Sequence, residues 1–185
     1  MTLELSEHDV HDLGIFTDGS FDAGTCSFAL MFSPEPVRVL REVKRVLAPG
    51  GRAALCVWDE PARNACFTTM FSAPREVTPI PAPLPDAPGP FALAAPGALQ
   101  RVLSEAGFRS IEVESAAAPF EFESLAEHFE MSCDMAAPVQ RAVSAMSVAD
   151  VDRFSARLAA ALAPYRLAAD RLRVPATPLC ATGTV

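Results

Sequence analysis

The sequence predicts an α/β fold with a mostly parallel sheet. Three observations carry this prediction: a mostly apolar run over 21–32, an amphipathic helical pattern over 37–47 and a second apolar run over 53–58. A strand, a helix and a strand in that order form a βαβ unit, in which the strands are parallel and the crossover is right-handed. The 185 residues are enough to bury a substantial core, so we expect a single domain over 1–185.

The first strand of this unit follows turn residues at 17–20, where aspartate, glycine and serine favour a tight turn. The run over 21–32 is too short and too rich in β-forming residues for a helix. We expect a buried strand that passes into a loop near Ser27. Upstream, apolar and polar residues alternate over Thr2–Leu5 and predict a further short strand.

The helix of the unit carries apolar residues on one face and charged residues on the other. Pro36 fits its start, because proline is tolerated in the first turn of a helix. Pro49, Gly50 and Gly51 end it abruptly. Ala53–Trp58 is then predicted as the second buried strand.

The rest of the chain predicts a loop, further strands and a helical insertion. Proline and alanine dominate 73–97, which we expect to be a loop. A short helix over 99–106 precedes Gly107, and apolar residues between 111 and 122 indicate strands. Helical patterns run from Leu125 to Leu172, with a break at Pro164, and a last strand is predicted over 179–185. We expect the insertion over 123–173 to form a lid over the carboxyl ends of the strands.

The net charge, the lengths of the apolar stretches and the N-terminal segment exclude several classes of protein. Acidic residues outnumber basic ones by 23 to 15, for a net charge of −8, which argues against a nucleic-acid partner. A helix needs about 20 consecutive apolar residues to span a bilayer, and no apolar stretch of this sequence approaches that length. The acidic segment 1–9 lacks the features of a secretory signal. We therefore expect a cytoplasmic protein with no membrane span.

The cysteines and histidines do not form a metal-binding pattern. The five cysteines include no CxxC pair, and an odd number without a secretory signal indicates reduced thiols. Cys26 and Cys56 lie in apolar runs, where free cysteine usually packs as a small hydrophobic residue. His8 and His11 are three residues apart and could share a helix face, but no further ligand cluster accompanies them, whereas structural zinc normally takes four ligands. We expect no metal.

Several segments occur in an order and spacing that resemble class I S-adenosylmethionine-dependent methyltransferases, especially small-molecule enzymes similar to those of quinone biosynthesis. They are DGSFD at 18–22, the apolar run to Phe32, REVKRVLAPGG at 41–51, Trp58-Asp59, LSEAGF at 103–108, APY at 163–165 and ATG at 181–183. The resemblance covers nearly the whole chain. It implies a partial Rossmann-like, doubly wound sheet with a helical lid insertion.

One part of the family pattern is missing. In the family, a glycine-rich loop after the opening strand grips the cofactor, and an acidic residue after the next strand holds the ribose. The nine glycines of this chain include no GxGxG pattern. By resemblance the chain starts at the family's third strand, without the first two strands and their helices. The close backbone approach to the cofactor and the helix N-terminus behind it would then be lost.

The resemblance implies four cofactor-binding positions. An aspartate after the family's third strand accepts the adenine amino group, and the next backbone N–H binds the ring; Asp9 and Val10 match these positions. Ser27 and Phe28 match the segment beside the methionine part of the cofactor. Without the resemblance, Asp9 is an exposed loop acid or helix cap, and Ser27 caps a turn.

For some other side chains the sequence allows two roles, contact with a ligand or packing in the core. Trp58 and Asp59 follow a parallel strand, at the edge where open α/β sheets bind ligands, but Trp58 fits the core equally well. His128 and Tyr165 either reach a substrate or pack within the insertion. The sequence singles out no catalytic base.

The predicted function is S-adenosylmethionine-dependent methyl transfer to a small, partly apolar acceptor, by this chain or by a longer or two-piece enzyme. Aligning donor and acceptor in a dry pocket removes several kcal/mol of barrier. The expected lid carries apolar residues that would either line such a pocket or pack in the core, namely Phe129, Met131, Met135 and Met146. The alternative is a non-catalytic methyltransferase-like remnant or interaction module that no longer binds the cofactor.

The absence of the family's first two strands predicts that the strand over 21–27 pairs with a further strand. Without them, the strand over 21–27 would expose unpaired backbone groups, and it carries no lysine or proline to protect an edge. We expect self-association through this edge, a partner that supplies the missing strands, or pairing with Thr2–Leu5 of the same chain.

Overall fold

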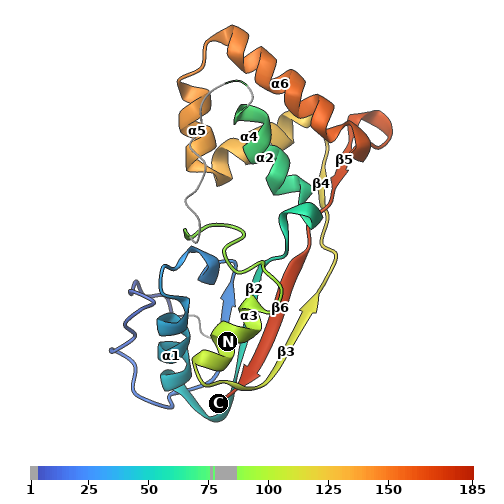
Figure 1. Ribbon diagram of the computed structural model, residues 1–185. Coiled ribbons are helices and arrows are strands. Elements are labelled where there is room, and N and C mark those ends of the chain that lie inside the picture. Colours follow the sequence, from blue (N-terminus) through green and yellow to red (C-terminus); the bar gives the residue numbers. More distant parts are fainter. Residues whose placement is uncertain (1–3, 76, 78–86) are drawn as a thin grey trace. The chain divides into compact units, whose positions relative to one another are not determined.

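Figure 1 shows the computed structural model, which describes residues 4–75, 77 and 87–185. The chain divides into two compact units. Unit 1 comprises Met1–Asp59, Pro85–Ala116 and Pro178–Val185, and unit 2 comprises Glu60–Leu84 and Ala117–Thr177. The insertion expected over 123–173 falls within unit 2.

Unit 1 is built on a four-stranded sheet of order β1-β2-β6-β3. β1 pairs in parallel with β2, and β6 pairs antiparallel with both β2 and β3. Three strands therefore run in one direction and β6 in the other, which confirms the mostly parallel α/β sheet. The strands are β1 (Phe21–Ser27), β2 (Leu47–Trp58), β3 (Arg109–Ser115) and β6 (Pro178–Thr184).

Two helices cover one face of this sheet (Figure 1). α1 (Pro36–Val46) connects β1 to β2, begins with proline and buries Val39 and Leu40. α3 (Ala98–Glu105) packs on β3 and β6 and is followed by Gly107 at φ 88°. The positive φ at Gly107 is a conformation that favours glycine, whereas the nearest atom to a Cβ there, Lys44 Nζ, is the end of a flexible side chain that can move aside. The predicted βαβ unit and the helix end at Gly107 are confirmed.

The opposite face of the sheet is open. Along β2, Ala53, Leu55 and Val57 are buried under the helices, whereas Ala54 is exposed. The register places Ala54 in one row with Thr25, Thr182 and Glu112, and all four are exposed. We call this row and the next one, which contains Ser27, Cys56, Cys180 and Glu114, the open face.

The prediction that Phe21–Ser27 is a buried strand is wrong. β1 is mostly exposed, and Phe21 retains 40% of its accessible surface. The segment does form a strand, but whether a strand is buried depends on the strands and helices that pack against it. Within the described residues β1 pairs on one side only, with β2, and one of its faces belongs to the open face.

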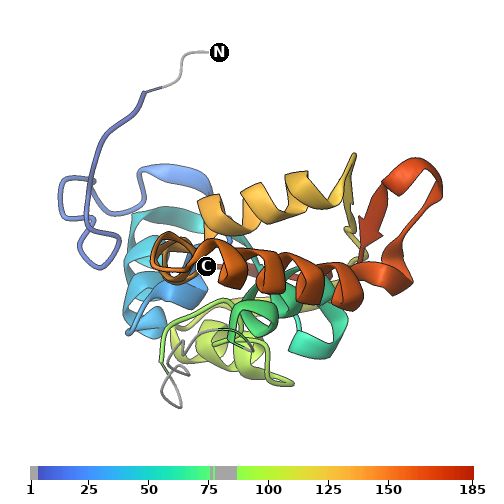
Figure 2. The ribbon, with the colours of Figure 1, turned by 90° about the horizontal axis from the view of Figure 1, so that it is seen from above.

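Unit 2 is mainly helical, with a two-stranded antiparallel sheet. α6 lies alongside α2 (Figure 2), and it begins with a capping box between Ser147 and Asp150. Phe154, Leu158 and Leu162 of α6 are buried. The elements are α2 (Ala65–Arg75), β4 (Phe120–Phe122), α4 (Leu125–Met135), α5 (Ala137–Ser144), α6 (Val148–Leu162) and β5 (Leu172–Val174). Short 3-10 turns lie at Leu30–Phe32, Pro61–Arg63, Ala163–Tyr165 and Ala168–Asp170.

Helix patterns did not extend as far as predicted. The last long helix ends at Leu162, before Pro164, and Leu172 belongs to β5 instead of a helix. Ala169 and Asp170 have positive φ, which breaks a helix. Helix α2, which buries Cys66, Phe67 and Met70, was not predicted from the sequence.

Two other expectations fall partly outside the described residues. Of the strand expected over Thr2–Leu5, only Glu4 and Leu5 are described, and both are irregular and exposed. Of the proline-rich loop over 73–97, residues 76 and 78–86 lie outside the description. Residues 73–75 end α2, and the stretch 87–97 forms turns, one of them joined to the Met31 carbonyl by the Gly89 N–H at 3.0 Å.

Candidate functional site

The carboxyl ends of β1 and β2 bring two predicted segments together. The N–H of Phe28 donates a 2.8 Å hydrogen bond to the Cys56 carbonyl, which holds the end of β1 against β2. The ring of Phe28 stacks on that of Trp58, with centroids 4.2 Å apart. Trp58 is buried, so its indole forms the floor of this stack. Ser27 is exposed beside it, and Asp59 is buried directly after β2.

Phe28 adopts a strained backbone conformation. Its φ of 53° lies in the left-handed region, which costs a bulky residue about 1–2 kcal/mol. Such residues concentrate at functional sites, where the surrounding structure holds them in place. Here the Cys56 carbonyl and the Trp58 ring provide that support.

Asp9 lies in the exposed N-terminal segment and is fixed by a histidine. One carboxylate oxygen of Asp9 accepts hydrogen bonds from the backbone N–H of His11, at 2.9 Å, and from its Nδ1, at 2.7 Å. These contacts lower the pKa of Asp9 below its usual value. His11 Nε2 lies 2.8 Å from Ser33 Oγ, just after the turn that follows Phe28. Both nitrogens of His11 therefore link Asp9 to the segment beyond β1.

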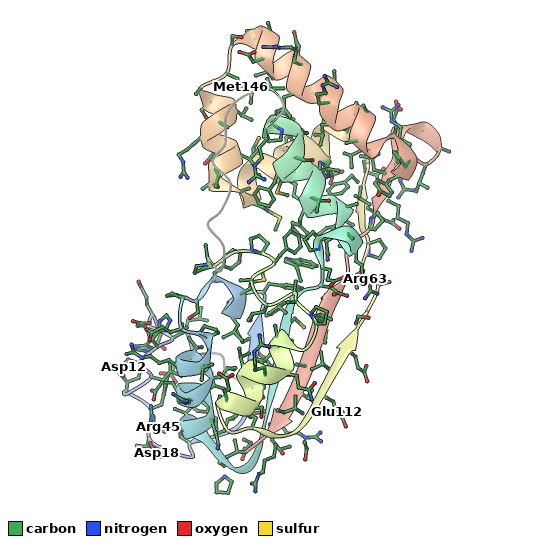
Figure 3. The ribbon with its side chains drawn as sticks, in the orientation of Figure 1. Asp12, Asp18, Arg45, Arg63, Glu112 and Met146 are labelled. Carbon is green, nitrogen blue, oxygen red and sulfur yellow. The ribbon has the colours of Figure 1, made fainter. Side chains whose placement is uncertain are left out.

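The N-terminal segment is also tied to α1 by charge (Figure 3). Glu42 accepts a 2.9 Å hydrogen bond from the Leu13 N–H, and Arg45 donates to the carbonyl of Phe16 at 3.0 Å. Arg45 forms ion pairs with Glu42 and Asp18, at 2.9 and 2.6 Å. The Arg45 hydrogen bond lowers the pKa of Glu42, and its carboxylate partners raise the pKa of Arg45. This network positions the segment that carries Asp9.

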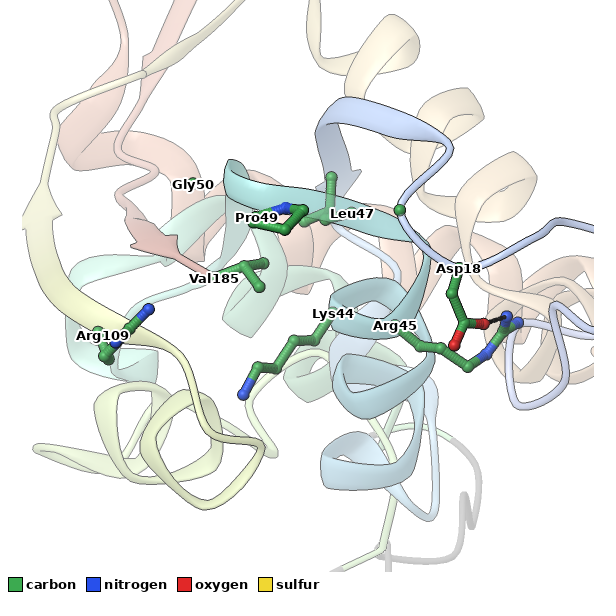
Figure 4. A pocket seen from close by; sticks show the side chains of 9 residues that line it. Asp18, Lys44, Arg45, Leu47, Pro49, Gly50, Arg109 and Val185 are labelled. Carbon is green, nitrogen blue, oxygen red and sulfur yellow. Dashed lines mark hydrogen bonds and ion pairs between the residues drawn. The ribbon is translucent and has the colours of Figure 1, made fainter.

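A pocket of about 480 Å³ lies at the other end of the strands (Figure 4). Its lining includes Lys44, Pro49 and Arg109, near the starts of β2 and β3, together with the Asp18–Arg45 ion pair. No residue that the sequence singled out as a cofactor position lines it. Of the predicted positions, Ser27 and Phe28 lie at the carboxyl edge, away from this pocket. Asp9 and Val10 lie in the N-terminal segment, which His11 links to Ser33.

His128 packs inside unit 2. It is fully buried against Phe122, its Nδ1 lies 3.3 Å from Ser132 Oγ, and its Nε2 makes no hydrogen bond of ordinary geometry within the described residues. Burial lowers the pKa of His128 to about 4, and the nearby Cys66 backbone opposes this shift in part. A neutral core histidine is thus the role that the structure supports. Tyr165 is half-buried in a 3-10 turn.

The apolar insertion residues divide between core and surface. Phe129 contacts Phe154, with ring centroids 5.0 Å apart, and belongs to the core of unit 2. Met131 and Met146 are half-buried, and Met135 is exposed. Their role as a lid stays a prediction.

The two histidines of the N-terminal segment contact other protein groups. His8 packs edge-on against Phe16, with ring centroids 5.7 Å apart, and His11 binds Asp9 and Ser33. Among the described residues, no three histidine, cysteine or acidic side chains gather in a way that could hold a metal ion. None of the described helices combines the length and apolar character that crossing a bilayer requires.

Sequence comparison finds a match between part of this chain and a protein family. Residues 2–55 match the family described as methyltransferase domain, and this segment contains all four predicted cofactor positions. A demethylmenaquinone methyltransferase of Mycolicibacterium paratuberculosis is 43% identical over 56 residues, which are 30% of this chain and 24% of that protein. The chain therefore matches about a quarter of the length of this curated relative.

Structure comparison extends the likeness to the rest of the fold. A candidate methyltransferase of Bacillus halodurans aligns with 98% of this chain and 77% of its own, with a TM-score of 0.54 and 16% identity. A S-adenosylmethionine-dependent methyltransferase of Archaeoglobus fulgidus aligns with 97% of this chain and 66% of its own, with a TM-score of 0.50 and 11% identity. At these identities the likeness concerns the fold. The sequence match to the methyltransferase-domain family thus covers residues 2–55, and the likeness of the whole chain to these solved methyltransferases is one of fold.

Proposed function

We propose that this chain takes part in methyl transfer from S-adenosylmethionine to a small, partly apolar acceptor in the cytoplasm. The observation that carries the proposal is the convergence of Ser27, Phe28 and Trp58 at the carboxyl edge of adjacent parallel strands. Open α/β sheets bind ligands at this edge. The bound cofactor supplies a methyl group on a positively charged sulfur, which is transferred to the acceptor nucleophile.

The residues of this edge suit parts of that cofactor. Asp9 stays ionised and exposed, so its carboxylate is available to accept the adenine amino group, and Val10 would present its backbone N–H to the ring. The Phe28–Trp58 stack and the Ser27 hydroxyl would border the methionine part. No residue here is assigned as a catalytic base, since positioning of donor and acceptor can supply much of the rate enhancement.

The chain would contribute only one wall of the cofactor site. Its glycines include no GxGxG pattern, so nothing in the sequence replaces the glycine loop that grips the cofactor in the family. We propose that a longer or two-piece enzyme provides that wall. The isolated chain should then bind the cofactor weakly.

Calorimetric titration with S-adenosylmethionine tests this proposal on the chain itself and on any longer form. Asp9→Asn should weaken binding about tenfold, since hydrogen bonds to charged groups contribute about 1.5–3 kcal/mol. Asp12→Asn is the matched control: it removes a nearby exposed carboxylate and should leave the affinity unchanged. Equal affinities of both variants and the unchanged protein would contradict the role of Asp9.

The edge of β1 supports a second candidate function, that of an interaction module without cofactor. Among the described strands only β2 pairs with β1, and Phe21 and Phe32 are 40% and 54% exposed. Such an edge recruits a further strand. We propose that it pairs with a second copy or with a partner that supplies the missing strands.

Sedimentation analysis separates these possibilities. Thr25→Lys places a charge on the edge strand and should dissociate assemblies formed through it. Thr182→Lys places the same charge in the same row, on the central strand β6, and serves as the control. A protein that remains monomeric at all concentrations and binds no methyltransferase-family partner would exclude assembly through β1.

A further inference from the structure

Two thiols face each other across the central strands of unit 1. Cys56 of β2 and Cys180 of β6 are direct register partners in an antiparallel pair. Their Sγ atoms lie 3.2 Å apart and share a hydrogen bond. They are 124 positions apart in the sequence, so only the folded sheet brings them together.

Both thiols belong to the open face. Ala54 and Thr182, in the adjacent row of the same two strands, are exposed, and Cys56 and Cys180 are each half-buried. By contrast, their neighbours Leu55 and Ala181 point to the helix-covered face and are buried. A small reagent can therefore approach the pair from the open face.

The other cysteines, all of them described, lie elsewhere. Cys26 of β1 is the register partner of Leu55 and so projects to the covered face, next to but not opposite Cys56. Cys66 is buried in α2 and Cys133 lies in α4, both in unit 2. The five cysteines thus contain one pair in direct thiol contact.

We propose that Cys56 and Cys180 form a reversible disulfide, with a low-molecular-weight disulfide as the oxidant. One thiol loses its proton and attacks a sulfur of the reagent, which forms a mixed disulfide and releases one reagent thiol. The second cysteine then attacks the protein sulfur of this mixed disulfide and releases the second reagent thiol. The protein loses two protons and two electrons, and the reagent disulfide takes them up and is reduced to two thiols.

The geometry requires a small movement. A disulfide has an S–S distance of about 2.0 Å, so the sulfurs must approach by roughly 1 Å. Side-chain rotation supplies most of this, because directly opposite Cβ atoms of antiparallel strands are already about 4.5–5.5 Å apart, close to the disulfide range. The bond would then fasten β2 to β6 one row from Trp58.

The surroundings make the reaction slow at neutral pH. Burial and the neighbouring Cys180 raise the pKa of Cys56 to about 11. On the open face, Glu114 of β3 is the register partner of Cys180, and Cys26 lies near Cys56 from the covered face. Neither is a cation that would stabilise a thiolate. Because the thiolate is the attacking species, the rate should rise about tenfold from pH 7.5 to pH 8.5.

The experiment is oxidation of the full chain with glutathione disulfide at pH 8.5, followed by alkylation, mass spectrometry and peptide mapping. We expect a loss of two alkylatable thiols, a cross-linked peptide pair containing Cys56 and Cys180, and complete reversal by dithiothreitol. The oxidised protein should melt on the order of 5–10 °C higher, since the bond closes a long loop. Cys26→Ser and Cys133→Ser should react like the unchanged protein, whereas Cys56→Ser should form no intramolecular disulfide.

Mapping of the unchanged protein decides the matter even if Cys56→Ser fails to fold. Retention of all five alkylatable thiols would overturn the proposal. So would a disulfide between other cysteines, or a glutathione adduct at Cys56 or Cys180 that does not close.

Discussion

The two units differ in how completely they bury their own surfaces. In unit 2, Phe154, Leu158 and His128 are fully buried, and the helices close on a common core. In unit 1, Leu55 is buried under α1 and α3, while Thr25, on the open face, is exposed. Unit 2 therefore has the features of a self-sufficient core, whereas unit 1 keeps one sheet face and one sheet edge available. The predicted site and the thiol pair both lie in unit 1.

The largest effect is expected in the core of unit 2. Phe154→Ala removes a fully buried ring and leaves a cavity, so the free energy of unfolding should fall by about 3–5 kcal/mol. Val148→Ala in the same helix is the control, because Val148 is 82% exposed and should cost less than about 0.5 kcal/mol. Urea denaturation measures both. Similar losses for the two variants would contradict a closed core in unit 2.

A matched pair of variants tests the two faces of the unit 1 sheet. Leu55→Ala lies on the covered face and should lower the free energy of unfolding by about 3 kcal/mol. Thr182→Ala lies on the open face and should change it by less than about 0.5 kcal/mol. A large loss for Thr182→Ala in the isolated chain would mean that the open face is covered.

The stability of unit 2 should depend on pH through His128. The pKa of His128 in the folded protein is about 4, whereas a histidine in an unfolded chain has a pKa of about 6.5. The folded state therefore favours the neutral ring. Stability is full above pH 6.5 and falls as the pH drops toward 4, by about 3 kcal/mol in total. Denaturation at several pH values should show this slope, and His128→Phe should abolish it. His8→Gln, in the exposed N-terminal segment, should retain it.

The smallest effect concerns the strain at Phe28. Phe28→Ala loses the stack on Trp58 but keeps a positive φ, whereas Phe28→Gly loses the stack and relieves the strain. The glycine variant should therefore be more stable than the alanine variant by about 1 kcal/mol. An alanine variant that is equally stable would show that the backbone at this position relaxes.

Local patterns predicted much of unit 1 from the sequence. The amphipathic spacing of α1 and the positive φ of Gly107 are encoded within a few residues, so these features could be predicted without tertiary information. Pro49, Gly50 and Gly51, which were expected to form a tight turn after the helix, lie within β2, which follows α1 directly. The exposure of β1 could not be predicted, because burial is decided by strands and helices that pack against it. Phe21–Ser27 is therefore the strand that its sequence predicts, but it is exposed where burial was expected.

The candidate site shows the same division. Ser27 and Phe28 were predicted beside the cofactor by resemblance, and the structure adds the stack on Trp58, which the position of Trp58 after a parallel strand had suggested as one of two roles. The link from Asp9 through His11 to Ser33 was missed. His11 lies two residues from Asp9, but its partner Ser33 is far along the chain, and no periodic pattern marks such a contact. The helix end at Leu172 was wrong because the positive φ values of Ala169 and Asp170 have no glycine to signal them.

The central claim is that the carboxyl edge of unit 1 forms one wall of a cofactor site. A titration of the isotope-labelled chain with S-adenosylmethionine, followed by NMR of the backbone amides and the Trp58 indole, tests it most directly because it also detects weak binding. We expect saturable shifts at Asp9, Val10, Ser27, Phe28 and the Trp58 indole, with Lys44 and Arg109 of the distant pocket unchanged. No shifts at saturating cofactor, or shifts confined to that pocket, would contradict it.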